Sequence, residues 1–203
     1  LTSKELERFK REYEQMSGLR SPYVLEVFSY NEANKEYVME FMNSPLDKYI
    51  SKNNGKLSFQ ERVRLGLQII RAFTYIHSKN ILHRDISPKN ILIKEYDDVV
   101  VVKIADFGLV KVVDSHLTSV NTDFKGYFND PNLVVEGFDK YDVLHETYAL
   151  TRILYFVITG KTSTDRVSSN MKFFIENGLS SDKRLRFKDI DELRQAFQNI
   201  KPS

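Results

Sequence analysis

Apolar positions along the first 43 residues predict one helix followed by two strands. Between residues 5 and 19 they recur at steps of three and four, the period of one helical face. These positions are Leu6, Phe9, Tyr13, Met16 and Leu19. The next apolar runs, YVLEVFSY and KEYVMEFM, are rich in β-branched and aromatic residues and flank the polar segment NEAN. This pattern predicts a β-hairpin after the helix.

The pattern changes near residue 44, where a mainly helical region is predicted to begin. The runs SPLDKYISK and SFQERVRLGLQIIRAFTYIHSK are typical of helices, and NILI and VVVVKIA predict a second hairpin around EYDD. The second helix is expected to pack through Val63, Leu67, Ile70, Phe73 and Ile76. Residues 109–145 show little periodicity and predict a long loop with short helical pieces, which in a compact domain is usually functional. Three more helices are predicted in ETYALTRILYFVITG, DRVSSNMKFFIENG and FKDIDELRQAFQNI.

Composition excludes several classes of function. The 203 residues are 41% hydrophobic, which is sufficient for a packed core. The net charge is only +2 and the basic clusters are short, so nucleic acid is not an expected partner. Absence of cysteine excludes disulfides and thiolate sites and suits a reducing compartment. No apolar run approaches the roughly 18–20 residues that span a bilayer, so we expect no membrane association and a cytoplasmic location.

Three charged residues interrupt the apolar run ILHRDISPKNILI at residues 81–93. Asp85 and Asn90 lie five positions apart, and Pro88 between them disfavours a regular helix or strand ladder. A loop held between two apolar segments keeps its side chains rigid, as a catalytic group requires. Asp106 follows in KIADFGL, at the end of another apolar run. Two carboxylates and one amide oxygen are the ligand types that Mg²⁺ prefers.

These segments carry a resemblance to a known family. HRDISPKN and DFG, with VMEFM upstream and ILYFVITGK downstream, resemble the motifs of the protein kinase family, H-R-D-x-x-x-x-N followed by D-F-G. The resemblance extends from about residue 5 to 197 and implies an α+β, protein kinase-like fold. Its implied parts are a partial small lobe (1–42), a hinge (39–43), a helical large lobe (43–203), a catalytic loop (83–90) and an activation segment (106–132).

The resemblance implies roles for the polar residues of the catalytic loop. Asp85 would accept the proton of the substrate hydroxyl, while Asn90 and Asp106 would hold Mg²⁺ on the phosphates of ATP. Serine/threonine-directed members usually place a Lys two residues after the base, where this chain has Ser87. Lys89 stands four residues after the base and is expected to contact the transferring phosphate. The preference for Ser/Thr or Tyr in the protein substrate therefore stays open, with Ser/Thr favoured.

Further positions of the nucleotide site follow from the same resemblance. Met39 would guard the back of the adenine pocket, the C=O of Glu40 and the N–H of Met42 would meet the adenine edge, and Leu92 would pack beneath the ring. Glu12 is implied as the helix carboxylate that pairs with a phosphate-binding Lys. That Lys, its strand and the glycine-rich loop are not in this sequence, and the chain starts at Leu1 rather than Met. We therefore expect a fragment of a longer kinase rather than a natural truncation.

Regulation and lobe alignment are also implied. Arg84 beside the base would bind a phosphorylated activation loop, with Thr118, Ser119 and Thr122 as candidate acceptors. His83 and Phe107 are expected to stack with a residue of the first helix, Met16, and so to align the lobes rather than to take part in catalysis.

The sequence departs from the family pattern after the activation loop. The motif A-P-E appears as Asp130-Pro131-Asn132, so the Glu that pairs with a late Arg is missing. Arg184 stands where we expect that Arg, and it would take water or Asp130 instead. Glu146 occupies the place of an Asp that braces the catalytic loop, a role that the longer carboxylate can serve if its helix shifts slightly.

The leading interpretation is a protein kinase that depends on ATP and Mg²⁺, and two alternatives stay open. A pseudokinase, which is a scaffold or binding module, is favoured by the altered A-P-E motif and opposed by the retained Asp85, Asn90 and Asp106. A small-molecule kinase of the aminoglycoside phosphotransferase type shares the fold, but the Arg of HRD and the hinge sequence favour a protein kinase. The sequence leaves the oligomeric state open.

Overall fold

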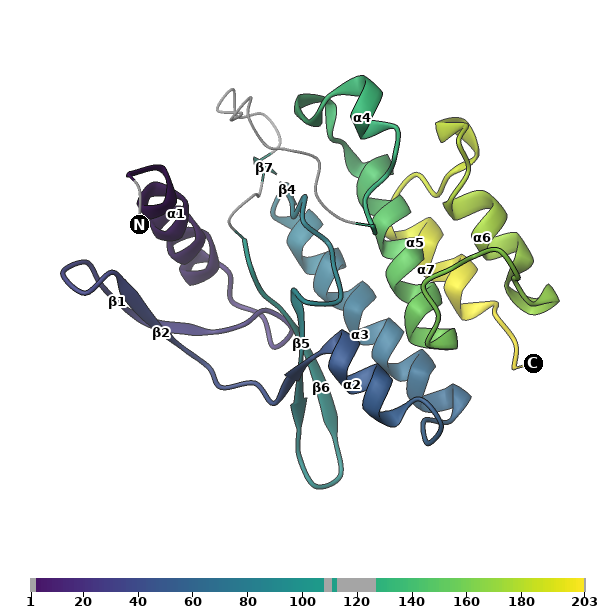
Figure 1. Ribbon diagram of the computed structural model, residues 1–203, viewed down its shortest axis with the longest axis horizontal. Helices are drawn as coiled ribbons and strands as arrows, with labels where there is room; N and C mark the ends of the chain where they lie inside the picture. Colours follow the sequence, from purple (N-terminus) through teal and green to yellow (C-terminus); the bar gives the residue numbers. More distant parts are fainter. Residues whose placement is uncertain (1–2, 108–110, 113–126, 203) are drawn as a thin grey trace.

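The computed structural model describes residues 3–107, 111–112 and 127–202 of the chain. Its first elements are α1 (Ser3–Gly18), β1 (Val27–Asn31) and β2 (Glu36–Met39). Figure 1 shows α1 beside the β1–β2 hairpin on one side of the molecule and the other helices gathered on the opposite side. The predicted helix and hairpin are therefore both present. Within the described ranges, no helix has the length and apolar character needed to cross a membrane.

Four aromatic rings pack α1 onto the hairpin. Tyr30 and Tyr37 are paired across the antiparallel strands, and Phe9 and Tyr13 lie one turn apart on α1. The ring of Phe9 stacks on Tyr37 at 4.8 Å between centroids, and the ring of Tyr13 stacks on Tyr30 at 5.1 Å. Two rings that lie opposite each other on neighbouring strands thus pack against two rings that lie four residues apart on the helix. This contact fixes the rotation of α1 about its axis.

The elements of the central region lead into and out of the catalytic loop predicted at 83–90. They are β3 (Ser44–Pro45), α2 (Leu46–Asn53), α3 (Phe59–Ser78), β4 (Ile81–Leu82), β5 (Ile91–Glu95), β6 (Val100–Ile104) and β7 (Lys111–Val112). Antiparallel pairing joins β3, β5 and β6 in one small sheet and β4 with β7 in another. The backbone of residues 23–25 also bonds to β6 through Ile104, which ties the segment after α1 to the strand before Asp106.

The C-terminal region is helical. Its elements are α4 (Leu133–Glu136), η1 (Phe138–Lys140), α5 (Val143–Thr159), η2 (Ser169–Met171), α6 (Lys172–Gly178), η3 (Lys183–Leu185) and α7 (Ile190–Gln198). Helix α5 is the predicted central helix, and most of its residues are buried. It begins at Asp142, whose side chain accepts from the N–H groups of Leu144 and His145, and it ends at Gly160 in the left-handed conformation with φ 69°.

The predicted packing face of α3 meets the core, but it is wider than expected. Ile70, Phe73 and Ile76 are buried, and Val63 and Leu67 are partly buried against the same core. Helix α3 contacts β6, α5 and α7, so more than one apolar stripe meets the core, and further residues are buried, among them Leu65, Ile69 and Ala72.

The helix predicted over DRVSSNMKFFIENG is shorter than expected, because Ser168 is extended and only η2 and α6 follow it.

Candidate active site

A buried carboxylate from α5 holds the start of the catalytic loop. Glu146 is fully buried, and its two oxygens accept from the backbone N–H of His83 at 3.0 Å and of Arg84 at 3.3 Å. The ring nitrogen Nε2 of His77, at the end of α3, lies 2.9 Å from the same carboxylate. The expectation that Glu146 braces this loop is confirmed. The part played by His77 was not predicted, because it lies in another helix.

The contacts of Glu146 keep it ionised in the protein interior. Burial raises the pKa of the Glu146 carboxyl group. The hydrogen bonds from His77 and from the N–H of His83 lower that pKa, and together with the charges of these residues they outweigh the effect of burial. The net pKa of Glu146 lies below its usual value. A permanently charged acceptor is therefore available to both loop N–H groups near neutral pH.

Arg84 occupies a strained backbone conformation that these contacts support. Its φ is +69°, in the left-handed region that non-glycine residues seldom adopt. The side chain is 4% exposed, and its Nη2 donates to the C=O of Phe138 at 2.8 Å while the guanidinium lies 4.2 Å from the centre of the Phe138 ring. Burial lowers the pKa of Arg84, with opposing contributions from Tyr141 and Glu146. Arg84 therefore links the catalytic loop to residues 138–141.

The backbone brings Asp85, Asn90 and Asp106 to one end of β5 and β6. The amide Nδ2 of Asn90 donates to the C=O of Asp85 at 2.9 Å, which closes the loop between them. The C=O of Asn90 accepts from the N–H of Ala105 at 2.9 Å, so the next residue, Asp106, follows directly beside the loop. Asp106 is half-buried and has a φ of +61°. The structure thus brings together the three positions that the sequence singled out.

The donor set at this end of the strands suits Mg²⁺ bound together with phosphate groups. In the described ranges, no cluster of three or more His, Cys, Asp or Glu side chains would hold a metal by itself. The Nδ2 of Asn90 is engaged by Asp85, which leaves the amide oxygen of Asn90 as its ligand atom. With the carboxylate of Asp106 this makes two protein oxygens, and Mg²⁺ usually takes its remaining ligands from water and substrate phosphates. Asn90 and Asp106 therefore fit the Mg²⁺ ion that the family pattern implies.

His83 and Phe107 are part of the core beneath the loop. Both side chains are fully buried, and their ring centroids lie 4.9 Å apart. The Nε2 of His83 lies 3.0 Å from the C=O of Ala105, and its Nδ1 lies 3.3 Å from the N–H of Asp85. These partners assign the proton to Nε2 and make Nδ1 an acceptor. The expected contact between the two rings is confirmed, and Met16 is buried in the same core.

Several backbone groups of the hinge at residues 39–43 have no hydrogen-bond partner among the described residues. The N–H of Glu40 donates to the C=O of Glu26 at 2.8 Å, and the N–H of Asn43 donates to the C=O of Ile93 at 2.9 Å. In contrast, the C=O of Glu40 and the N–H of Met42 make no hydrogen bond within the part of the chain that the structure describes. An exposed peptide group can bond to water or to a ligand. The acceptor and the donor that the family pattern assigns to adenine are therefore among the hinge groups available to a ligand.

Side chains from β2, β5 and β6 lie near the hinge. Lys103 of β6 pairs with Glu40 at 2.5 Å, an ion pair that holds the hinge against the sheet and that was not predicted. Met39, at the end of β2, is 48% exposed. Leu92 is half-buried and lies on the side of β5 opposite its two fully buried isoleucine neighbours. Neither side chain is fully buried, although Leu92 packs against the core.

Glu12 has a partner that the sequence did not suggest. Its Oε1 accepts from the phenol of Tyr37 at 2.8 Å, across 25 positions of the chain. Lys89 is exposed, as a residue that meets a bound phosphate would be. Thr118, Ser119 and Thr122, the predicted phosphorylation sites, lie outside the described residues.

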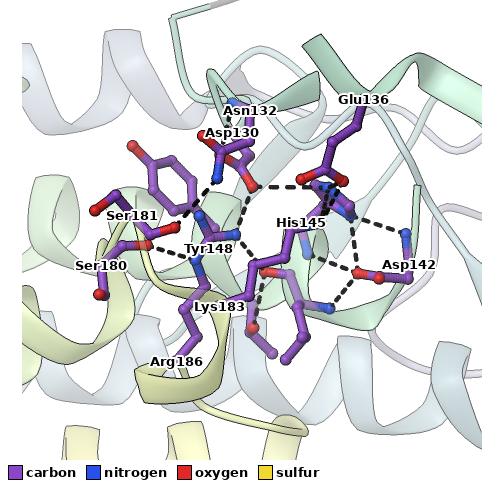
Figure 2. Close-up of polar contacts among 12 residues, drawn as sticks. Asp130, Asn132, Glu136, Asp142, His145, Tyr148, Ser180, Ser181, Lys183 and Arg186 are labelled. Atoms are coloured by element: carbon purple, nitrogen blue, oxygen red, sulfur yellow. Dashed lines mark hydrogen bonds and ion pairs between the residues drawn. The ribbon is translucent and has the colours of Figure 1, made fainter. Parts of the chain in front are cut away.

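The prediction that Arg184 is the late arginine is wrong. Arg186 is the buried one: its side chain is 1% exposed and pairs through Nη1 with the fully buried Asp130, while its Nε donates to the C=O of Ser180 at 2.7 Å. Arg184 is 89% exposed and pairs with Asp182 at 2.7 Å. Figure 2 shows Arg186 and Asp130 converging beside Tyr148. The missing Glu at position 132 is thus replaced by a carboxylate two residues earlier.

Beside this pair a second polar contact joins the same segments. Lys183 pairs with Glu136 at 2.5 Å, and its Nζ lies 2.9 Å from Nε2 of the buried His145. His145 in turn lies 2.8 Å, through Nδ1, from a carboxylate oxygen of Asp142. Figure 2 shows these residues meeting from α4, the start of α5 and η3. The two sets of charges are connected, because Nε2 of His145 also lies 3.7 Å from Oδ2 of Asp130.

Comparison with known proteins identifies the family. The model of the protein kinase domain matches residues 1–199, and the chain belongs to this family. Among curated relatives, serine/threonine-protein kinase 36 of Pongo abelii is 32% identical, over 78% of this chain and 12% of that protein. Serine/threonine-protein kinase PrkC of Bacillus subtilis is 30% identical, over 81% of this chain and 25% of that protein. The chain thus spans a quarter or less of these relatives.

A solved structure resembles the whole chain. The crystal structure of the Rad53 kinase domain and SCD2 covers 100% of this chain and 81% of its own, with a TM-score of 0.75 and 25% sequence identity. This similarity confirms the α+β, kinase-like fold.

Proposed function

We propose that this chain is the catalytic part of a protein kinase that transfers the γ-phosphoryl group of ATP to a serine or threonine hydroxyl of a protein. The observation that carries the proposal is the loop closed by Asn90 on the C=O of Asp85 and bonded to Ala105, with Asp106 next in the chain. Relatives named as serine/threonine kinases support the choice of hydroxyl. The cysteine-free composition suits the cytoplasm.

In this proposal the residues of the loop act on the attacking hydroxyl and on the phosphates. The carboxylate of Asp85 takes the hydroxyl proton as the oxygen bonds to the γ-phosphorus, and the bond from that phosphorus to the β–γ bridging oxygen breaks. Asn90 and Asp106 supply oxygen ligands to Mg²⁺, which neutralises phosphate charge when bound. Lys89, exposed beside them, adds a positive charge for the transferred group.

The hinge provides the adenine site. The C=O of Glu40 accepts from the exocyclic amine of adenine and the N–H of Met42 donates to a ring nitrogen, so both hinge groups gain partners. Met39 and Leu92 line the pocket. We place the boundary between a small lobe (1–42) and a large lobe (43–203) at this hinge.

Arg84 is proposed to sense phosphorylation of the activation segment. Its Nη2 is anchored on Phe138, but its buried Nε has no hydrogen-bond partner among the described residues. A phosphate on Thr118, Ser119 or Thr122 would provide an acceptor for that nitrogen.

The proposal is tested with the full-length gene product, ATP, Mg²⁺ and a general protein substrate. Asp85→Asn keeps the shape of the side chain but removes the base, and we expect transfer to fall by about 10²–10⁴-fold. The matched control is Asp97→Asn, an exposed carboxylate in the β5–β6 turn, which should leave the rate unchanged. Transfer that persists in Asp85→Asn contradicts the assignment of the base.

The same preparation separates the alternatives. A pseudokinase would bind ATP without transferring phosphate in the wild type. An enzyme of the aminoglycoside phosphotransferase type would phosphorylate an aminoglycoside and leave the protein substrate unlabelled.

A further inference from the structure

We propose that Tyr37 is a positioning residue that holds the carboxylate of Glu12 at the nucleotide site. The inference rests on the proposed function and deepens it, because it assigns to this chain's β2 a task in the ATP site that the sequence motifs do not contain. It depends on three observations, which are the contact itself, the packing that orients the phenol, and the charges around it.

The contact is short and joins two separate elements. The phenol oxygen of Tyr37, in β2, donates to Oε1 of Glu12, in α1, at 2.8 Å. Burial and the neighbouring carboxylate of Glu12 raise the pKa of Tyr37, so the phenol keeps its proton near neutral pH. Tyr37 is thus a permanent donor to Glu12. A hydrogen bond to a charged acceptor is among the stronger ones in proteins.

Packing leaves the phenol little freedom. The ring of Tyr37 stacks on Phe9 at 4.8 Å and lies 6.1 Å from the ring of Tyr13. Phe9 and Tyr13 flank Glu12 on successive turns of α1, and Met16 of the same helix is buried in the core. The rings therefore set the rotation of α1, and the O–H of Tyr37 sets where the carboxylate of Glu12 lies.

The phenol of Tyr37 is an uncharged donor, which explains why a tyrosine suits position 37. The negative charge of Asp106 also raises the pKa of Tyr37, so the phenol stays protonated and neutral. A neutral donor fixes Glu12 without cancelling its negative charge. A Lys at position 37, in contrast, would neutralise the negative charge of Glu12.

The experiment compares four forms of the full-length protein, namely wild type, Tyr37→Phe, Glu12→Gln and the double variant. We expect Tyr37→Phe to lower kcat/KM for MgATP by about five- to tenfold. Because the phenol acts through Glu12, adding Tyr37→Phe to Glu12→Gln should cause less than a twofold further loss. The matched control is Tyr13→Phe, which removes a hydroxyl from the same aromatic cluster and should change kcat/KM less than twofold.

Thermal unfolding of each variant shows whether the fold is kept. If the role of Tyr37 is purely structural, Tyr37→Phe and Tyr13→Phe should change kcat/KM for MgATP equally. Equal effects, or independent losses in the double variant, overturn the inference. If the wild type transfers no phosphate, the proposed function fails separately. The affinity of the same variants for a fluorescent ATP analogue then tests Tyr37, with the same coupling to Glu12 expected.

Discussion

The predicted catalytic loop (83–90) and the segment 129–136, which includes the end of the predicted activation segment (106–132), are both fixed by buried charges, but in different ways. In the loop, Glu146 accepts from two backbone N–H groups, and it lies at the position that the family pattern assigns to a carboxylate. At the segment end, Asp130 pairs with Arg186, and both lie two residues from the positions that the pattern led us to expect. For the first contact the family pattern predicted the residue itself. For the second contact it predicted only the types of side chain, an arginine and a carboxylate.

The difference reflects what each contact must satisfy. Backbone N–H groups have fixed positions once the loop is formed, so their acceptor has to come from one place on α5. A pair of side chains has more freedom, because a shift of two residues at one end can be matched by another side chain at the other end. Figure 2 shows how many charged side chains surround Asp130 and Arg186, which makes such an exchange possible.

The largest expected effect comes from breaking the side-chain pair. Arg186→Met leaves Asp130 buried without its cation, and we expect the free energy of unfolding to fall by about 3–5 kcal/mol. Arg184→Met removes the exposed arginine two residues earlier and should change it by less than about 0.5 kcal/mol. Guanidinium chloride unfolding of both variants measures the difference. If the two losses are equal, Arg186 does not anchor the segment.

These two arginines show what the sequence could and could not predict. Helix and strand periods, both hairpins and the central helix α5 were predictable because they depend on neighbouring residues. The family pattern added the positions of Asp85, Asn90 and Asp106, which the backbone brings together. Within KRLRF, however, no local period tells which arginine turns inward, because η3 is a single short turn.

Contacts between distant segments were missed for the same reason. His77 reaches Glu146 across 69 positions and Tyr37 reaches Glu12 across 25, and each is unremarkable in its own segment. Leu65, Ile69 and Ala72 of α3 were not predicted to be buried, because that helix meets β6, α5 and α7 together. Such features depend on the packed fold rather than on local pattern.

A smaller effect is expected from the loop brace. Glu146→Gln keeps the size of the side chain but removes its charge, and we expect about 1.5–3 kcal/mol of lost stability. Since the folded pKa of Glu146 is lowered, its contribution is full above the usual Glu pKa of about 4.3 and is lost as pH falls through the folded value. The Gln variant should therefore lose less stability than wild type between neutral pH and the acid range below about 4.3.

Unfolding by urea at a series of pH values measures this difference. Glu176→Gln, an exposed position in α6, is the control and should keep both the stability and the acid slope of the wild type. An unchanged acid slope in Glu146→Gln would mean that the carboxylate of Glu146 does not supply the acid-sensitive stability.

The smallest effect sharpens the comparison between the two arginines. Hydrogen bonds from the side chain and the backbone N–H of Arg184 bring the pKa of Asp182 to about 2. In Arg184→Met the side-chain bonds are lost, and the pKa of Asp182 should rise toward the usual value of about 3.9. Because both groups are on the surface, global stability should hardly change. Carboxyl chemical shifts followed by NMR titration report the pKa of Asp182 directly.

The control is a mild substitution of the other arginine, Arg186→Lys. In this variant the pKa of Asp182 should stay at about 2. A rise of that pKa in Arg186→Lys would show that the surface turn and the buried anchor are one coupled unit rather than two.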